Sequence, residues 1–398
     1  MRDRLTKRYR LALFGSVYMV QGIAFAFLRN YHKPYLSARG ISADVIATLT
    51  FFLFLPFLLK FFVGILSDRL SLFGQGHRKP YMVLGLVLAS VSLCAAAFVP
   101  PDRHLFLFEL FTMLTSLGIT FLDAVTDGLA IELTTIHERA LLQGVMVGGK
   151  GTAFVLFSLL FGVLISWRDG IAVFVIMGIS MLFPLIWIQR LPAFPSNREQ
   201  FSWAAFKGIM APHRAVFALY AVVSAFGAFG TEGIATYYLR VRFGGSNIAI
   251  GHYGALRGIG AVVGALMGAW LINRFGRTRI AYAAAALTSL VAVIFGLARD
   301  GGDVLLIAFF WGAVWAFGEM VFVVLAMDIT DPRIAAATFA AMATLVNLSG
   351  AVAESLSVAL SDDIGFQTLF WGLSAINLLT IPVLYRLFRA MPDSIFRR

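Results

Sequence analysis

Eight charged side chains lie well inside the long apolar runs of this 398-residue sequence. A charged group in hydrocarbon is strongly unfavourable unless it faces water or an opposite charge. Residues at such positions are therefore expected to carry a function or to form a structural ion pair. These residues are Lys60, Asp123, Asp127, Lys150, Glu232, Arg257, Glu319 and Glu354.

The densest acidic group lies in the stretch "FLDAVTDGLAIEL" at 121–133. Asp123 and Asp127 are four residues apart, so a helix places both on one face. They are predicted to accept protons or to pair with Lys60 or Lys150. A purely structural ion pair that holds helices together is the alternative.

Motifs of soluble enzymes are missing from the sequence. It contains no GxSxG, HExxH or Walker A pattern and no cluster of cysteine and histidine. The single cysteine, Cys94, can form neither an internal disulfide nor a CxxC metal site. We therefore expect no enzyme activity, no metal and no cofactor.

The composition indicates which elements position these charged residues. Hydrophobic residues make up 60% of the chain and charged residues only 13%, which is far from the balance of a soluble domain. Stretches of about 20 apolar residues are long enough to cross a membrane as helices. The sequence therefore predicts an all-α membrane protein with twelve spans, at 11–31, 43–66, 79–99, 105–131, 141–165, 170–189, 214–239, 249–273, 279–298, 303–328, 334–360 and 366–388.

The basic residues predict the topology. The net charge is +11, and it lies in short loops between spans, which argues against a nucleic-acid partner. With both termini in the cytoplasm, 21 of the 32 Lys and Arg fall on the cytoplasmic side and eight on the other. The basic start leads into a run long enough to span, without a clear cleavage site, so we interpret it as the first helix.

Two halves of the chain resemble each other. The predicted domains are 1–189 and 214–398, joined by a cytoplasmic linker at 190–213 that holds three prolines. "GILSDRL" at 64–70 corresponds to "GAWLINRFGRTR" at 268–279, and "DGLAIELT" to "VVLAMDIT". The second correspondence aligns Asp123 with Glu319 and Glu132 with Asp328. A same-direction repeat of six spans is typical of transporters.

These motifs resemble the major facilitator superfamily, whose loops after spans 2 and 8 follow a G-x-x-x-D-R-x-G-R-R pattern. The second copy departs by carrying Asn273 in place of Asp, and "LSLFGQG" is inserted in the first. Within the superfamily, "VQGIAFAF", "LPFLLKFFVGILSDR" and "DAVTDGLAIEL" resemble the AmpG-like branch of muropeptide permeases, acetyl-CoA transporters and single-protein siderophore importers. Muropeptide permeases carry two further spans, so the smaller siderophore importers are favoured.

The resemblance implies that spans 3, 6, 9 and 12 face lipid and that the other eight surround a cavity. All eight intramembrane charges fall in the second group, as that arrangement requires. The proton-coupling candidates are Asp123, Asp127, Glu232 and Glu319. Asp123 and Glu319 occupy corresponding positions in the two repeats, so these two are favoured. Replacing Asp127 is expected to impair proton coupling less.

Cationic and aromatic residues are the candidates for binding substrate. They are Lys150, Arg257, Lys60, Arg29 and Tyr31. Lys60 is as well explained by an ammonium group that extends to the membrane surface, and Arg29 and Tyr31 by an interface anchor.

Residues at the cytoplasmic ends of helices are predicted to latch that face rather than to bind solute. They are Asp68, Arg69, Glu132, Arg139, Asn273, Arg274, Arg277 and Asp328.

The leading hypothesis is a proton-coupled importer of an anionic or zwitterionic organic solute in the inner (plasma) membrane. By resemblance, a siderophore is the first guess for the solute and a muropeptide fragment the second. The alternatives are drug or metabolite efflux by proton antiport and a membrane assembly factor that transports nothing. The expected partners are the solute, protons and lipid, and the expected state is a monomer.

The topology can be tested by labelling single cysteines in a Cys94→Ala background. Ser196→Cys, in the predicted linker, should resist a membrane-impermeant thiol reagent in intact cells, whereas Asp300→Cys should react. Labelling at position 196 without labelling at position 300 would reverse the predicted orientation.

Overall fold

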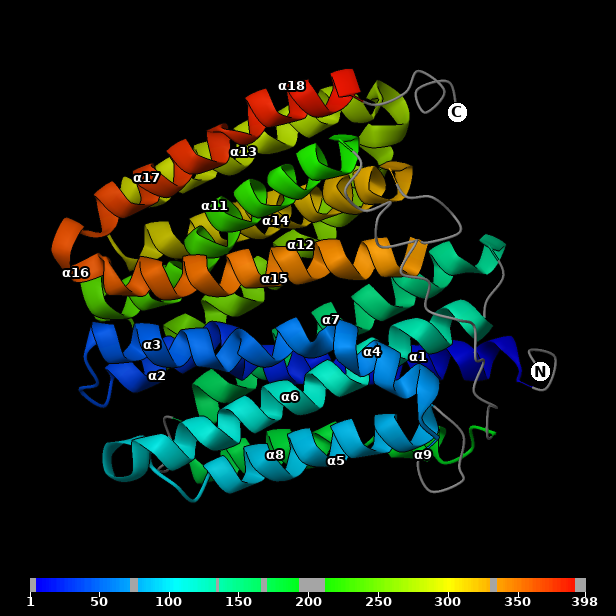
Figure 1. Cartoon of the computed structure of the whole chain (residues 1–398). Helices are drawn as coiled ribbons and strands as arrows, with labels where there is room; N and C mark the ends of the chain where they lie inside the picture. The colour runs from blue at the N-terminus through cyan, green and yellow to red at the C-terminus, as the bar shows by residue number, and fades with distance from the viewer. Residues whose placement is uncertain are drawn as a thin grey trace. The chain divides into compact units, whose positions relative to one another are not determined.

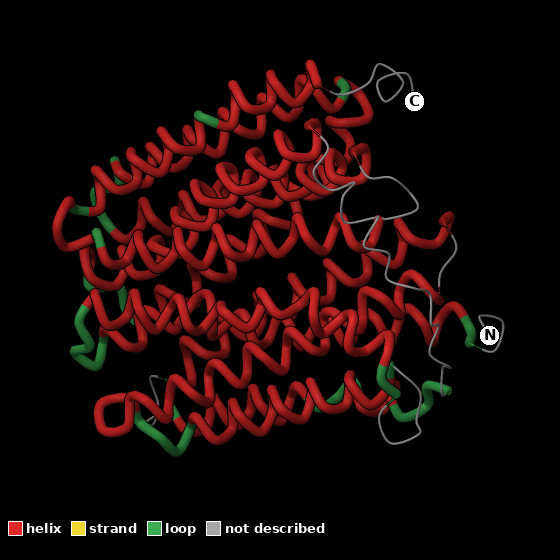
Figure 2. Tube along the Cα trace, viewed as in Figure 1, coloured by secondary structure: helices red, strands yellow, loops and turns green. Residues whose placement is uncertain are grey.

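The computed structural model describes residues 5–71, 78–133, 136–165, 170–192, 212–329 and 335–390. These residues form helices joined by short loops and contain no strand (Figures 1 and 2). Twelve helical segments within them are long and apolar enough to cross a membrane. All twelve predicted spans are thereby confirmed, and the all-α membrane fold with them.

The helices group into two compact units. Unit 1 comprises residues 1–41, 52–199 and 245–255, and unit 2 comprises residues 42–51, 200–244 and 256–398. The predicted division at the 190–213 linker remains a prediction, and residues 193–211 of that linker lie outside the described part of the chain.

Unit 1 holds most of the helices of the first half of the chain. Figure 1 shows α5, α6 and α8 of this unit running side by side. Its elements are α1 (Lys7–Phe25), the π-helical turn η2 (Ala26–Tyr31), α2 (His32–Ser37), the 3₁₀ turn η3 (Leu55–Leu59), α4 (Lys60–Arg69), α5 (Lys79–Ala96), α6 (Pro101–Leu133), α7 (Ile136–Leu164), α8 (Ile171–Met181) and α9 (Leu185–Ile188).

Unit 2 holds the remaining helices, among which α13 packs against both α14 and α17. Helix α3 (Ala43–Phe54) belongs to it through its first residues, and α12 (Asn247–Phe275) through its last. The others are α11 (Pro212–Phe243), α13 (Arg277–Gly296), α14 (Gly301–Ile329), α15 (Ala335–Ala359), α16 (Ser361–Ile364), α17 (Phe366–Leu378) and α18 (Thr380–Ala390).

The first span is longer than the sequence predicts. It extends from Lys7 to Ser37 because the helix continues through the π-helical turn η2 into α2. The hydropathy of the sequence predicts that the span ends before His32 and Lys33, because both are polar. In the structure, however, both side chains are fully buried against protein. Protein contacts therefore extend the span where composition alone would end it.

Proline positions Lys60 in the second span. Pro56 lacks the N–H that would continue the hydrogen-bond ladder of α3, and the chain passes through the 3₁₀ turn η3. Helix α4 then starts at Lys60. Similarly, Gly276 separates α12 from α13 with φ of 81°, a value that favours glycine.

Each unit has its own packed core. In unit 1, rings from η2, α2, α6, α7 and α8 meet edge to face or stacked around Phe27, whose centroid lies 4.8 Å from that of Phe174. In unit 2, a buried cluster from α11, α13, α14, α15 and α18 includes Phe217 and Leu325.

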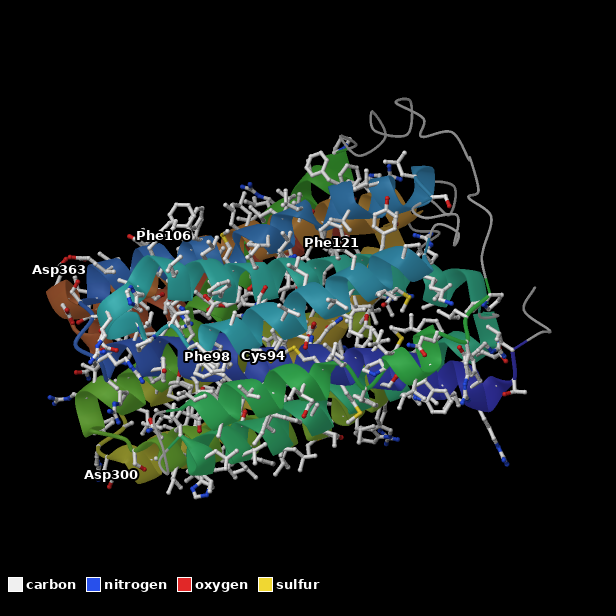
Figure 3. The ribbon with its side chains drawn as sticks, turned by 90° about the horizontal axis from the view of Figure 1, so that it is seen from below. Cys94, Phe98, Phe106, Phe121, Asp300 and Asp363 are labelled. Atoms are coloured by element: carbon white, nitrogen blue, oxygen red, sulfur yellow. The ribbon has the colours of Figure 1, made fainter. Side chains whose placement is uncertain are left out.

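Large apolar side chains also cover the outside of the helices. Phe106 and Phe98 are 77% and 68% exposed, and both project from the ends of helices of unit 1 in Figure 3. Such exposure is unfavourable in water but matches a hydrocarbon solvent. Asp300 and Asp363, in contrast, lie at one end of the helices of unit 2, in the connections between spans.

Helices α5 and α6 approach closely because glycines face each other. A methyl group added at Gly118 would lie 2.5 Å from the backbone of Gly85 and Ala89. Small residues permit this approach between membrane helices.

Gly118→Ala should therefore destabilise the protein by about 1–3 kcal/mol through overpacking. Gly148→Ala is the matched control, because no atom lies within 4 Å of the added methyl group. Thermal unfolding in detergent should show a lower Tm for Gly118→Ala alone. Equal Tm values for the two variants would contradict the close packing.

Candidate ion-pair sites within the membrane spans

One lysine lies between two carboxylates in unit 1. The Lys60 Nζ atom is 2.6 Å from Asp123 Oδ2 and 2.7 Å from Asp127 Oδ2. The three side chains are between 18% and 36% exposed. The helical period of α6 places both carboxylates on one face, and the end of η3 places Lys60 opposite them. We call this group the Lys60 cluster.

Two neutral side chains of the first span complete the Lys60 cluster. Gln21 donates its amide N–H to Asp123 Oδ1 at 2.5 Å, and Tyr18 donates its hydroxyl to Asp127 Oδ1 at 2.6 Å. Each carboxylate thus accepts one charged and one neutral hydrogen bond. Such bonds replace the water that these groups lose on burial.

The charges of the Lys60 cluster do not cancel. One ammonium and two carboxylates leave a net charge of −1 when both aspartates are ionised. A further cation, Lys150, interacts electrostatically with Asp123, and its ammonium group lies 5.1 Å from the centre of the Phe25 ring. A proton on either aspartate would also make the cluster neutral.

A second ion pair lies in unit 2, and it is more completely enclosed. Arg257 Nε is 2.6 Å from Glu232 Oε1, and Trp311 donates its indole N–H to Glu232 Oε2 at 2.5 Å. The Arg257 guanidinium also lies 4.9 Å from the centre of the Trp315 ring. Both charged side chains are less than 10% exposed. Within this pair, one cation faces one carboxylate, so the two charges balance.

The aligned carboxylates of the two repeats have different surroundings. Asp123 is held by Lys60, whereas Glu319 is exposed on α14 and forms no ion pair with another described residue. Whether the two face each other remains a prediction.

The two candidates near the far end of span 1 are already engaged. Tyr31 is buried and donates its hydroxyl to backbone carbonyls of Ser158 and Asn247 in the same unit. The Arg29 guanidinium lies 5.3 Å and 4.7 Å from the ring centres of Phe25 and Phe54. This placement is consistent with anchoring as well as with binding.

Most of the predicted latch falls outside the described side chains. This applies to Asp68, Arg69, Glu132, Arg139, Asn273 and Asp328. Arg274 is exposed beside Trp270 and Phe275, and Arg277 begins α13. Unit 1 instead shows an ion pair between Arg10 and Glu138 at 2.8 Å, which joins α1 to α7.

Sequence reasoning missed the neutral partners of the two ion-pair sites. Tyr18, Gln21 and Trp311 carry no charge, so the search for charges inside apolar runs passes over them. A search for polar side chains on the first span at the depth of Asp123 would have found Gln21.

Twelve apolar helices long enough to cross a membrane, with ion pairs between some of them, are the features of a multi-pass membrane protein. A family model described as Major Facilitator Superfamily matches residues 11–354. The chain therefore belongs to the Major Facilitator Superfamily, and the predicted superfamily is confirmed.

Known proteins of similar sequence are transporters. The chain is 24% identical to the "Folate-biopterin transporter" of Synechocystis sp. (strain ATCC 27184 / PCC 6803 / Kazusa), over 94% of this chain and 79% of that protein. It is 26% identical to "Probable folate-biopterin transporter 7" of Arabidopsis thaliana, over 33% and 31%. These relatives are not AmpG-like or siderophore proteins by name, so the predicted branch remains a prediction.

Solved structures share the fold. The nucleoside transporter NupG superposes with a TM-score of 0.72 at 13% identity, covering 96% of this chain and 99% of the other. A POT family transporter in complex with 5-aminolevulinic acid gives a TM-score of 0.79 at 12% identity and covers 96% of both chains.

Removing the shared cation should destabilise unit 1. Lys60→Met leaves two adjacent carboxylates without their lysine, and we expect a loss of about 1–3 kcal/mol, below that of a fully buried pair. Lys60→Met combined with Asp127→Asn should recover part of the loss. Thermal unfolding measures both, and Lys7→Met, at an exposed position, is the control. No rescue in the double variant would refute the shared pairing.

Proposed function

We propose that this chain is a proton-coupled secondary transporter that moves an anionic or zwitterionic organic solute across the inner (plasma) membrane. The observation that carries the proposal is the sharing of Lys60 by Asp123 and Asp127 at 2.6 and 2.7 Å. A proton can bind one aspartate while the other keeps its contact with the lysine. Protonation therefore leaves no buried charge without a partner.

The ion pair of unit 2 suits a different role. Protonation of Glu232 would remove the negative charge that lies 2.6 Å from Arg257 Nε, and a guanidinium does not lose its proton in proteins. This is costly, so we place proton binding at the Lys60 cluster. Arg257, with Trp315 beside it, is the better candidate for attracting an anionic solute.

Within the Lys60 cluster, we place the transported proton on Asp127. A hydroxyl both donates and accepts, so Tyr18 can turn its hydrogen-bond direction when Asp127 is protonated. The Gln21 N–H that faces Asp123 only donates, and Lys150 adds a second cation near Asp123. This geometry reverses the order that the repeat alignment favours, and it leaves Glu319 as the second candidate.

The transport cycle that we propose is alternating access, in which the two predicted halves rock about a site near the midplane. Proton release from Asp127 restores the full negative charge of the Lys60 cluster, and Lys150 and Arg257 offset the charge of the solute. The predicted latch residues would close the cytoplasmic face. Both termini would be cytoplasmic and the working unit a monomer.

The relatives support a choice of first solutes to test. Folate is an anionic solute with a planar heteroaromatic ring, and the relative from Synechocystis is named as a folate-biopterin transporter. Cations beside aromatic rings, as in Arg257 with Trp315, suit such a ring. We therefore place folate and biopterin first, followed by a ferric siderophore and a muropeptide fragment.

The proposal is tested with purified protein in proteoliposomes. Asp127→Asn should abolish accumulation driven by a pH gradient, because the site that binds and releases the proton is gone. It should retain measurable counterflow of labelled solute at equal pH. Uptake of the four solutes, with the gradient in either direction, gives substrate and direction together.

Two further variants sharpen this test. Glu232→Gln should weaken solute binding more than it weakens coupling, since it disturbs Arg257. Asp363→Asn, at a helix end remote in sequence from both sites, should behave as wild type. If Asp127→Asn still concentrates solute against its gradient, the proton is carried elsewhere, and Glu319→Gln is the next variant.

A further inference from the structure

One face of α6 carries an unbroken line of polar side chains that ends in the Lys60 cluster. Successive members are three or four residues apart, and at 100° per residue they fall within an arc of about 80°. The segment lies beyond His104, whose φ of −136° interrupts the helix near its start. The members of this polar stripe are Glu109, Thr112, Ser116, Thr120, Asp123 and Asp127.

A second titratable pair lies at the other end of the polar stripe. His32 Nε2 is 2.8 Å from Glu109 Oε1, and the Thr112 hydroxyl lies 3.2 Å from Glu109 Oε2. His32 is fully buried and Glu109 is nearly so. At 1.5 Å per residue, Glu109 is about 21 Å along the helix from Asp123. Nothing in the proposed transport cycle uses this pair.

The polar stripe faces the first span at both ends. His32 in α2 contacts Glu109, and Gln21 in α1 contacts Asp123. Gly118, on the opposite side of α6, packs against Gly85 and Ala89 of α5. The stripe therefore follows the contact between α6 and the first span.

Two buried polar atoms along this contact have no hydrogen-bond partner among the described residues. They are Ser116 Oγ, midway along the stripe, and His32 Nδ1 at its end. Both residues have zero exposure. A buried polar atom without a partner is unfavourable, and a bound water molecule is the usual partner at such positions.

We propose that the polar stripe of α6 conducts protons between the His32–Glu109 pair and the Lys60 cluster. This inference rests on the proposed function for its purpose, because it supplies the proton that Asp127 carries. The ligands are protons and bridging water molecules.

The relay conserves protons at every step. A proton that reaches Glu109 is passed to the Thr112 hydroxyl, which releases its own proton to the next water molecule. Ser116 and Thr120 repeat this exchange, and the last proton binds Asp127 or Asp123. Hydroxyls one turn apart are separated by about 5–6 Å, so one water molecule is needed in each gap. Each hydroxyl then turns back to its first orientation.

Other charged groups surround the far end of the stripe. Arg29, Lys33 and Tyr35 lie on the first span near His32, and Asp102, Arg103 and His104 lie on α6 before Glu109. The described part of α8 carries no titratable group, and neither does α7 from Gly151 to Leu164. Helix α5 offers Cys94, whose thiol faces the Val175 carbonyl. Glu109 and His32 are thus the pair best placed to exchange protons with the stripe.

Two threonines of α6 make a matched test. Thr120 lies on the stripe, and Thr115 lies about 100° away from its centre. Both are fully buried, and each donates its hydroxyl at 2.9 Å to the carbonyl four residues earlier. Replacement by valine keeps the shape and removes the hydroxyl in both. Only the relay distinguishes the two positions.

In proteoliposomes, Thr120→Val and Ser116→Ala should lower uptake driven by a pH gradient by roughly tenfold, as the loss of one hydrogen bond in the relay implies. Solute exchange at equal pH should fall much less. Thr115→Val should stay within about twofold of wild type for both measurements. Equal behaviour of Thr120→Val and Thr115→Val would overturn the relay.

A measurement without solute separates this inference from the proposed function. Infrared difference spectra of the purified protein between acidic and alkaline pH should contain a carboxyl band that Glu109→Gln removes and His32→Gln shifts. Absence of a Glu109 band would overturn the relay even if transport is proton-coupled. The opposite outcome is also possible. If the wild-type protein moves no protons with solute, but a change in the Glu109 band is followed by a change in the Asp127 band, and only Thr120→Val abolishes this coupling, the proposed function is refuted and the relay is retained.

Discussion

The arrangement of unit 1 depends on a single ammonium group shared by two carboxylates inside a membrane span. Removing three charged groups from water has a large free-energy cost. Close contact among the three groups offsets this cost, and Gln21 and Tyr18 contribute further hydrogen bonds. This requirement constrains three separate spans at one depth. Pro56 ends α3 so that α4 can start at Lys60, and the period of α6 brings both aspartates to one side.

In each unit a cation stabilises a carboxylate inside the membrane spans, but the cation differs. A lysine between two carboxylates can keep its ion pair with one of them while the other is protonated. The Lys60 cluster is therefore suited to a change of protonation state. An arginine with one carboxylate and an indole N–H has no such freedom, because its charge is permanent. The two ion-pair sites thus differ both in their cation and in the number of carboxylates that contact it in these pairs.

Helix α6 has two different contact surfaces on opposite faces. On one face, Gly118 has no side chain, which allows α5 to pack closely and fixes the helix in place. The other carries polar side chains from Glu109 to Asp127 against the first span. Rigid packing on one side keeps the distances on the other side constant, and a line of hydrogen-bonding groups requires this constancy.

The sequence by itself determined the all-α fold and the twelve spans, because hydrocarbon demands apolar helices of fixed length and makes each internal charge conspicuous. The superfamily was predicted separately, from the resemblance of the loop motifs after spans 2 and 8. The sequence also identified Lys60, Asp123 and Asp127, but left their pairing open between Lys60 and Lys150. Only the tertiary structure decided that pairing, added Tyr18, Gln21 and Trp311, and extended the first span to Ser37. The reason is physical: hydropathy measures the preference for lipid, whereas partners and buried ends depend on contacts between distant helices.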